Sequence, residues 1–109
     1  MKKLTMILAS VILAAAVAQA DVKSGQKAYL KMLKVSFAMN GTKFAAEHSV
    51  AQWEELFANG AAGFIKEYSE RFPKAQAILT NPSNAAKLQD IGDFAKEYGN
   101  DSGNIPSCG

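Results

Sequence analysis

The sequence is poor in the residues on which metal centres, disulfide frameworks and most catalytic sites depend. Among 109 residues there is one cysteine, Cys108, and one histidine, His48. A single cysteine excludes an internal disulfide and a multi-cysteine metal site. No alternation of apolar and polar residues is sustained over five positions, so strands are not predicted. With 49% hydrophobic and 20% charged residues, the composition excludes collagen-like and strongly charged disordered chains.

The first twenty residues have the three parts of a secretory signal. Two lysines near the start precede an apolar run over 7–17, and Ala18-Gln19-Ala20 forms a small-x-small cleavage site. We therefore predict that residues 1–20 are a cleaved signal peptide, that the mature chain begins at Asp21, and that it is periplasmic. The apolar run is too short to span a bilayer comfortably, so we expect no membrane attachment after cleavage. An uncleaved anchor helix is the alternative.

Cleavage changes the charge of the protein. Lys2 and Lys3 are two of the 12 basic residues, so the mature chain carries ten basic and ten acidic side chains and is neutral. A neutral exported protein is not expected to bind nucleic acid. The charges are unevenly distributed, because residues 21–46 hold five lysines and one acidic residue, whereas residues 47–109 hold five basic and nine acidic residues.

Helical spacing of apolar residues recurs along the mature chain. Ser49 and Gln52 have the spacing of a capping box, and Asn59-Gly60 is typical of a helix end. We predict an all-α fold with about five short helices in a single domain over 21–99, followed by a flexible tail over 100–109. The predicted elements are a helix over 22–37 that ends at Met39-Asn40-Gly41, a turn over 44–48, a helix from Val50 to Asn59-Gly60, a helix over 64–72, a short helix over 73–79, and a last helix from Asn81-Pro82-Ser83 to Gly99.

Four lysines form a stripe on the first predicted helix. Their spacing of i, i+4, i+8 and i+11 places them on one face, separate from the apolar stripe. The stripe consists of Lys23, Lys27, Lys31 and Lys34. One interpretation is that it docks an acidic periplasmic protein partner. The alternatives are a solvated helix face, or attraction between the basic and acidic parts of the same chain.

The same helix resembles the first helix of class I c-type cytochromes. In that family a glycine is followed after three residues by an aromatic residue, and after three more by Cys-x-x-Cys-His. Here Gly25 and Tyr29 have that spacing, and Leu33-Lys34-Val35-Ser36-Phe37 occupies the place of the haem-attachment motif. The resemblance implies a cytochrome c-like arrangement in which the first helix crosses a C-terminal helix, with Gly25 and Tyr29 meeting Gly92, Phe94 or Tyr98.

The haem-attachment motif itself is degenerate. Leu33 and Ser36 stand where the family has its two cysteines, and neither can form a thioether bond. Phe37 stands where the family has its proximal histidine and offers no lone pair to iron, and no methionine follows Met39. Covalent haem of the usual kind is therefore excluded on chemical grounds. We expect Leu33 and Phe37 to fill the interior instead.

His48 is the one residue that suits a noncovalent cofactor. A solitary imidazole is able to ligate noncovalent haem, or copper together with Met32 or Met39. The spacing of these residues matches no metal motif, and metal sites normally need three or four ligands. The alternative is that His48 lies at the end of a short helix, where its partial positive charge is favourable. We predict no metal site and no resident cofactor, with noncovalent haem through His48 as the alternative.

Cys108 lies next to last in the predicted tail. A lone cysteine in an oxidising compartment pairs between chains, reacts with a small thiol, or serves a redox partner. We predict a fraction of disulfide-linked dimer.

Nothing in the sequence indicates an enzyme. No Gly-x-Ser-x-Gly turn presents a serine, and no glycine-rich phosphate loop is present. We expect an exported cytochrome c-like helical protein without covalent haem, which acts as an accessory or docking protein in periplasmic electron transfer. The alternatives are a small helical binder of an apolar ligand or noncovalent haem, and a structural periplasmic protein with no ligand.

Overall fold

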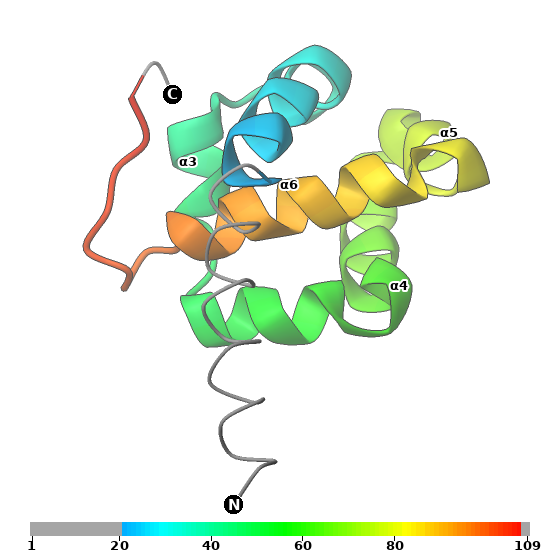
Figure 1. Cartoon of the computed structure of the whole chain (residues 1–109). Helices are drawn as coiled ribbons and strands as arrows, with labels where there is room; N and C mark the ends of the chain where they lie inside the picture. The colour runs from blue at the N-terminus through cyan, green and yellow to red at the C-terminus, as the bar shows by residue number, and fades with distance from the viewer. Residues whose placement is uncertain (1–20, 108–109) are drawn as a thin grey trace, which may run out of the picture.

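Residues 21–107, which the computed structural model describes, fold into helices joined by short turns (Figure 1). The elements are a first helix over 21–32, α2 (Lys34–Phe37), α3 (Gly41–Ala45), α4 (Val50–Arg71), the 3-10 helix η1 (Pro73–Ala75), α5 (Gln76–Leu79), the 3-10 helix η2 (Pro82–Asn84) and α6 (Ala85–Glu97). No strand occurs within 21–107, so the predicted all-α class is confirmed. The predicted signal peptide and Cys108 lie outside the described residues.

The helix predicted over 22–37 forms as two pieces, of which the second, α2, ends at Phe37 as predicted. Leu33 interrupts it before α2, and Ala38 follows α2 in the left-handed conformation, with φ of 56°. Asn40, which was expected to help end this helix, instead caps α3, where its side-chain oxygen accepts a hydrogen bond from the Lys43 N–H at 2.8 Å. The short turn predicted over 44–48 therefore begins at Gly41. Asparagine suits both a helix end and a helix start, and the spacing of residues does not distinguish the two.

The two signals predicted for α4 are confirmed. Ser49 Oγ accepts from the Gln52 N–H at 3.1 Å and Gln52 Oε1 accepts from the Ser49 N–H at 2.9 Å, which completes the capping box. Asn59, Gly60 and Ala61 all have left-handed φ values, between 55° and 68°. This turn divides α4 into two halves that run in different directions (Figure 1).

α6 lies between the first helix and the first half of α4, and a glycine permits close approach on each side (Figure 1). A Cβ atom on Gly25 would stand 1.9 Å from the Asp90 carbonyl oxygen and 2.9 Å from Phe94 Cβ. On the other side, a Cβ atom on Gly92 would stand 2.6 Å from the ring of Phe57. The expected meeting of Gly25 with Phe94 is thus confirmed, whereas Gly92 packs against α4.

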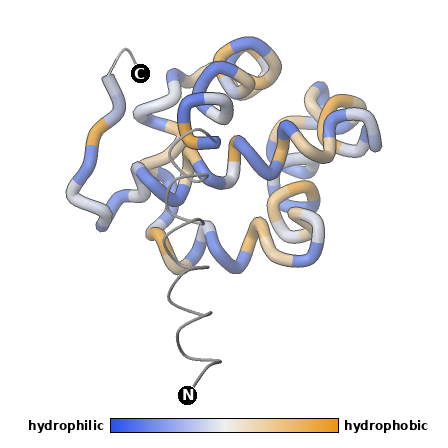
Figure 2. Tube along the Cα trace, in the orientation of Figure 1, coloured by the Kyte–Doolittle hydropathy of each residue, from blue (hydrophilic) through white to orange (hydrophobic). Residues whose placement is uncertain are grey.

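An aromatic core fills the space between the helices. Tyr29 and Phe44 stack with ring centroids 4.3 Å apart, and their neighbours continue the contacts through the molecule. The Tyr29 hydroxyl donates to the Met39 carbonyl at 2.7 Å, so its polar end is satisfied. Along the helices, hydrophilic residues alternate with the hydrophobic residues (Figure 2). The largest fully buried side chains are Trp53, Tyr29, Tyr68, Phe44, Phe64, Phe94, Leu33, Leu79, Leu88 and Ile91.

Candidate functional site

The four lysines of the predicted stripe, Lys23, Lys27, Lys31 and Lys34, are all exposed, and together we call them the lysine ridge. The first helix presents the first three and α2 presents the last. The opposite side of this helix is held in the core by Gly25 and Tyr29, which orients the ridge outward. Within residues 21–107, no carboxylate lies within ion-pairing distance of these four ammonium groups. The ridge is therefore not neutralised by the acidic part of the described chain.

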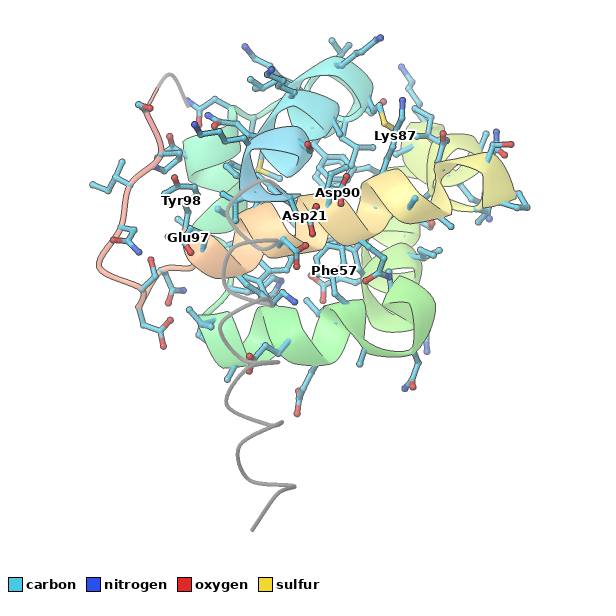
Figure 3. The ribbon with its side chains drawn as sticks, viewed as in Figure 1. Asp21, Phe57, Lys87, Asp90, Glu97 and Tyr98 are labelled. Carbon is cyan, nitrogen blue, oxygen red and sulfur yellow. The ribbon has the colours of Figure 1, made fainter. Side chains whose placement is uncertain are left out.

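The structure adds a fifth lysine, Lys87, from the start of α6. Together with Lys27 and Lys31 it borders an open groove of about 350 Å³ between the first helix and α6, which we call the lysine groove. In Figure 3, Lys87 lies on the side of α6 that faces the first helix. Ala28 and Met32 provide apolar surface in the groove. The sequence pattern did not reveal Lys87, because only the crossing of the two helices brings it to the ridge.

Val35 stands beside the ridge with its side chain almost wholly in water, at 90% relative exposure. It precedes Ser36 on α2, whose inward face is held by Phe37. An exposed apolar side chain next to Lys31 and Lys34 adds contact area to a surface that is otherwise charged.

Leu33 and Phe37, which were predicted from the sequence to fill the interior, pack in the core. Leu33 is fully buried and Phe37 is 3% exposed. The Phe37 ring lies 4.7 Å from that of Phe72 and 5.1 Å from that of Tyr68, centroid to centroid. These side chains offer neither a thiol nor a ring nitrogen, so they do not fit covalent haem.

His48 is held by groups of α4. Its Nε2 atom lies 2.9 Å from Glu67 Oε2, and its ring meets the Trp53 ring edge-on at 4.7 Å. Of the predicted soft partners, Met32 lines the lysine groove and Met39 packs against the hydrophobic core. The contact with Glu67 engages one of the two ring nitrogens that could bind a ligand.

Beside His48, Glu47 forms the centre of a polar cluster. Arg71 binds both of its carboxylate oxygens, each at 2.9 Å, and the Tyr68 hydroxyl donates to one of them. Burial raises the pKa of Glu47, but the hydrogen bonds from Arg71 and Tyr68 outweigh it, so the pKa lies below its usual value. Burial and the adjacent Glu47 carboxylate raise the pKa of Tyr68. The cluster attaches the connection between α3 and α4 to the second half of α4, so its side chains stabilise the fold.

The C-terminal tail is extended and folds back against the domain. Gln26 Nε2 donates to the Ser107 carbonyl at 2.9 Å, and Asn104 Nδ2 donates to the Glu97 carbonyl at 3.3 Å. Pro106 is buried, whereas Ile105 is 80% exposed. An open hollow of about 390 Å³ lies between this tail, the end of α6 and α3. The mobility predicted for the tail stays a prediction, and Cys108 follows Ser107 just outside the described residues.

Several glutamates of α4 lie on the helix surface. Glu54, Glu55 and Glu70 are exposed, and Glu67 is engaged by His48 and, at 3.4 Å, by Arg71. Ser49, next to His48, uses its hydroxyl to cap α4. These side chains therefore have local structural partners or face solvent.

Comparison with known proteins places the chain in no family. No helix within residues 21–107 combines the length and apolar character needed to cross a bilayer. No protein-family model matches the sequence, and neither a curated protein nor a solved structure matches it.

Proposed function

We propose that this chain is an exported docking protein that binds an acidic protein partner through the lysine ridge, as an accessory of periplasmic electron transfer. The observation that carries the proposal is the row of four exposed ammonium groups with no carboxylate partner in the described chain. Such a row attracts an acidic protein surface at distances up to about the Debye length, which raises the rate of association.

The position of the ridge supports this function. The first helix is anchored against α6 through Gly25 and against Phe44 through Tyr29, so its outer face is presented on a rigid element. Lys87 widens the basic surface beyond a single helix, and Val35 adds exposed apolar contact. A helix face that is merely solvated requires neither a further lysine from α6 nor an exposed apolar side chain beside it.

The electron-transfer context is supported by the crossing of the first helix with α6. A glycine packed against an aromatic residue at this crossing is the arrangement that the resemblance to class I c-type cytochromes implies, and Gly25 lies against Phe94. A chain with this arrangement but without haem-attaching residues is suited to bind an electron-transfer protein without transferring electrons itself.

The test is a pair of charge reversals on the ridge. The double variant Lys27→Glu with Lys31→Glu is compared with Lys66→Glu plus Lys74→Glu, which changes the net charge equally at exposed positions elsewhere. The probes are a purified acidic flavodoxin and, as a negative control, a basic cytochrome. Binding is measured by titration calorimetry at about 20 mM and about 200 mM salt.

We expect the flavodoxin to bind the unmodified chain at low salt and to lose affinity about tenfold or more in the ridge variant, because each exposed charge pair contributes up to about 1 kcal/mol and reversal replaces attraction with repulsion. The control variant should bind as the unmodified chain does. Equal binding by all three proteins, or binding indifferent to salt, overturns the proposal.

A further inference from the structure

The seam between the first helix and α6 has an acidic end. Oxygen atoms of Asp21, Asp90 and Asp93 lie within 4.8 Å of one another at half-buried positions. Burial, and then the adjacent charges of Asp21 and Asp93, raise the pKa of Asp90, as expected for crowded like charges. Lys96 reaches Asp93 at 3.5 Å, which leaves the cluster with more negative than positive charge.

The same seam has a basic end, the lysine groove. Lys27, Lys31 and Lys87 are all exposed there. Asp90 both borders this groove and belongs to the acidic cluster, so the two ends adjoin. Figure 3 shows Asp21 and Asp90 close together, with Lys87 further along α6. Charge therefore changes sign along a single continuous surface.

We infer that this seam is a self-association surface, on which a second copy of the chain binds with its acidic cluster (Asp21, Asp90 and Asp93) against the lysine groove, and its lysine groove against the acidic cluster. A surface with adjoining opposite charges becomes complementary to itself when it is rotated by a twofold axis between the two ends. Both contacts then form at once, which doubles the number of favourable charge pairs.

The charges favour a second copy over a uniformly acidic surface at the seam. An acidic surface that covers the groove also faces Asp90 and is repelled by it, whereas a second copy meets each sign with its opposite. The mature chain is predicted to be neutral, so two copies do not repel each other through their net charge. Ala28 and Met32 add apolar area at the groove. This inference goes beyond the proposed function and does not depend on it, although both use Lys27 and Lys31.

The test is a charge swap. One chain carries Lys31→Glu with Lys87→Glu, which reverses two of the three groove lysines and keeps Lys27. The other carries Asp90→Lys with Asp93→Lys, which reverses two of the three clustered aspartates and keeps Asp21. All chains also carry Cys108→Ser, so that a disulfide cannot imitate the dimer. Matched controls are Lys66→Glu with Lys74→Glu, and Glu54→Lys with Glu55→Lys, at exposed positions off the seam. Circular dichroism establishes that each variant is folded.

Sedimentation equilibrium at about 20 mM salt measures the dimer fraction, and the measurement is repeated at about 200 mM salt. The parent chain and both controls should dimerise, each swapped chain alone should weaken dimerisation at least tenfold, and an equimolar mixture of the two should restore it as a one-to-one complex. A monomeric parent chain at low salt, or a mixture that stays monomeric, overturns the inference.

The outcome is distinguishable from that of the proposed function. The Asp90→Lys and Asp93→Lys chain keeps the whole lysine ridge, so it should still bind flavodoxin. If this chain binds flavodoxin but the mixture of swapped chains does not dimerise, only the inference of self-association is wrong. If the swap succeeds and no chain binds the acidic probe, the ridge serves the second copy and the proposed acidic partner is wrong.

Discussion

Single residues in this domain hold segments that are distant in the sequence. Glu47 receives both guanidinium hydrogen bonds of Arg71 and the hydroxyl of Tyr68, which joins the end of the α3 region to the second half of α4. The Arg71 guanidinium also lies over the Tyr68 ring, 4.8 Å from its centroid. Glu47 is therefore the residue at which a change in protonation should affect stability.

We predict that Glu47→Gln lowers the free energy of unfolding by about 1 kcal/mol at neutral pH, a magnitude reduced because the ion pair is partly exposed. The amide keeps an oxygen acceptor for Tyr68, so the substitution removes mainly the charge. Because the pKa of Glu47 is lower in the folded chain than its usual value of 4.5, its stabilisation is fully present above that value. The contribution disappears as the pH falls through the lowered pKa of the folded state.

Urea unfolding of the unmodified chain and of Glu47→Gln between about pH 7 and pH 3 measures the difference in their free energies of unfolding. It should be largest near neutrality and should shrink as the pH falls below 4.5. The variant Glu54→Gln, at an exposed position on α4, should show no such difference. A stability difference for Glu47→Gln that is constant over this pH range contradicts the prediction.

At the scale of elements, the position of the ridge depends on the close crossing of the first helix with α6. Gly25 lets the two backbones approach so closely that a methyl group has no space beside the Asp90 carbonyl. The same crossing places Lys87 beside Lys27 and Lys31, and Asp21 beside Asp90 and Asp93. One glycine thus positions both ends of the charged seam.

We predict that Gly25→Ala destabilises the domain, although alanine is the better helix former by about 1 kcal/mol. The steric conflict with α6 involves backbone atoms and exceeds that gain, because overpacking costs up to about 3 kcal/mol and more where backbones must separate. We expect a melting temperature lower by about 10 °C in thermal unfolding followed by circular dichroism. Ser24→Ala, at the adjacent exposed position, should leave it unchanged or raise it. An unchanged melting temperature for Gly25→Ala would show that the helices do not cross so closely.

At the scale of the whole molecule, aromatic side chains fill much of the interior between the helices. Phe37 stacks on Phe72 and Tyr68, and Leu33 is fully buried. The hollows among residues 21–107 described above are open ones, between the tail and α6 or along the helix crossing.

We predict that the mature chain, purified from a periplasm that matures c-type cytochromes, shows no Soret band in its visible spectrum. The physical reason is that Leu33, Ser36 and Phe37 cannot attach or ligate haem, and that Glu67 occupies Nε2 of His48. A Soret band would contradict the prediction. Its loss in His48→Ala would then favour the alternative of a binder of noncovalent haem.

Local signals predicted the elements better than their junctions. The capping box at Ser49 and the stop at Asn59-Gly60 were confirmed because each depends on hydrogen bonds and backbone angles within a few residues. The helix predicted over 22–37 does end at Phe37, but the break at Leu33 was not predicted. The stop lies at Ala38, which has a left-handed φ, and not at the predicted Met39-Asn40-Gly41.

The sequence by itself determined the all-α class, the lysine stripe and the absence of haem-attaching groups, since these depend on residue type and helical spacing alone. Only the tertiary structure decided that Lys87 joins the ridge, that three aspartates gather at the other end of the seam, and that His48 pairs with Glu67. Each of these contacts joins different elements. Their positions follow from how closely and at what angle helices pack, which the size of side chains at a few crossing points controls.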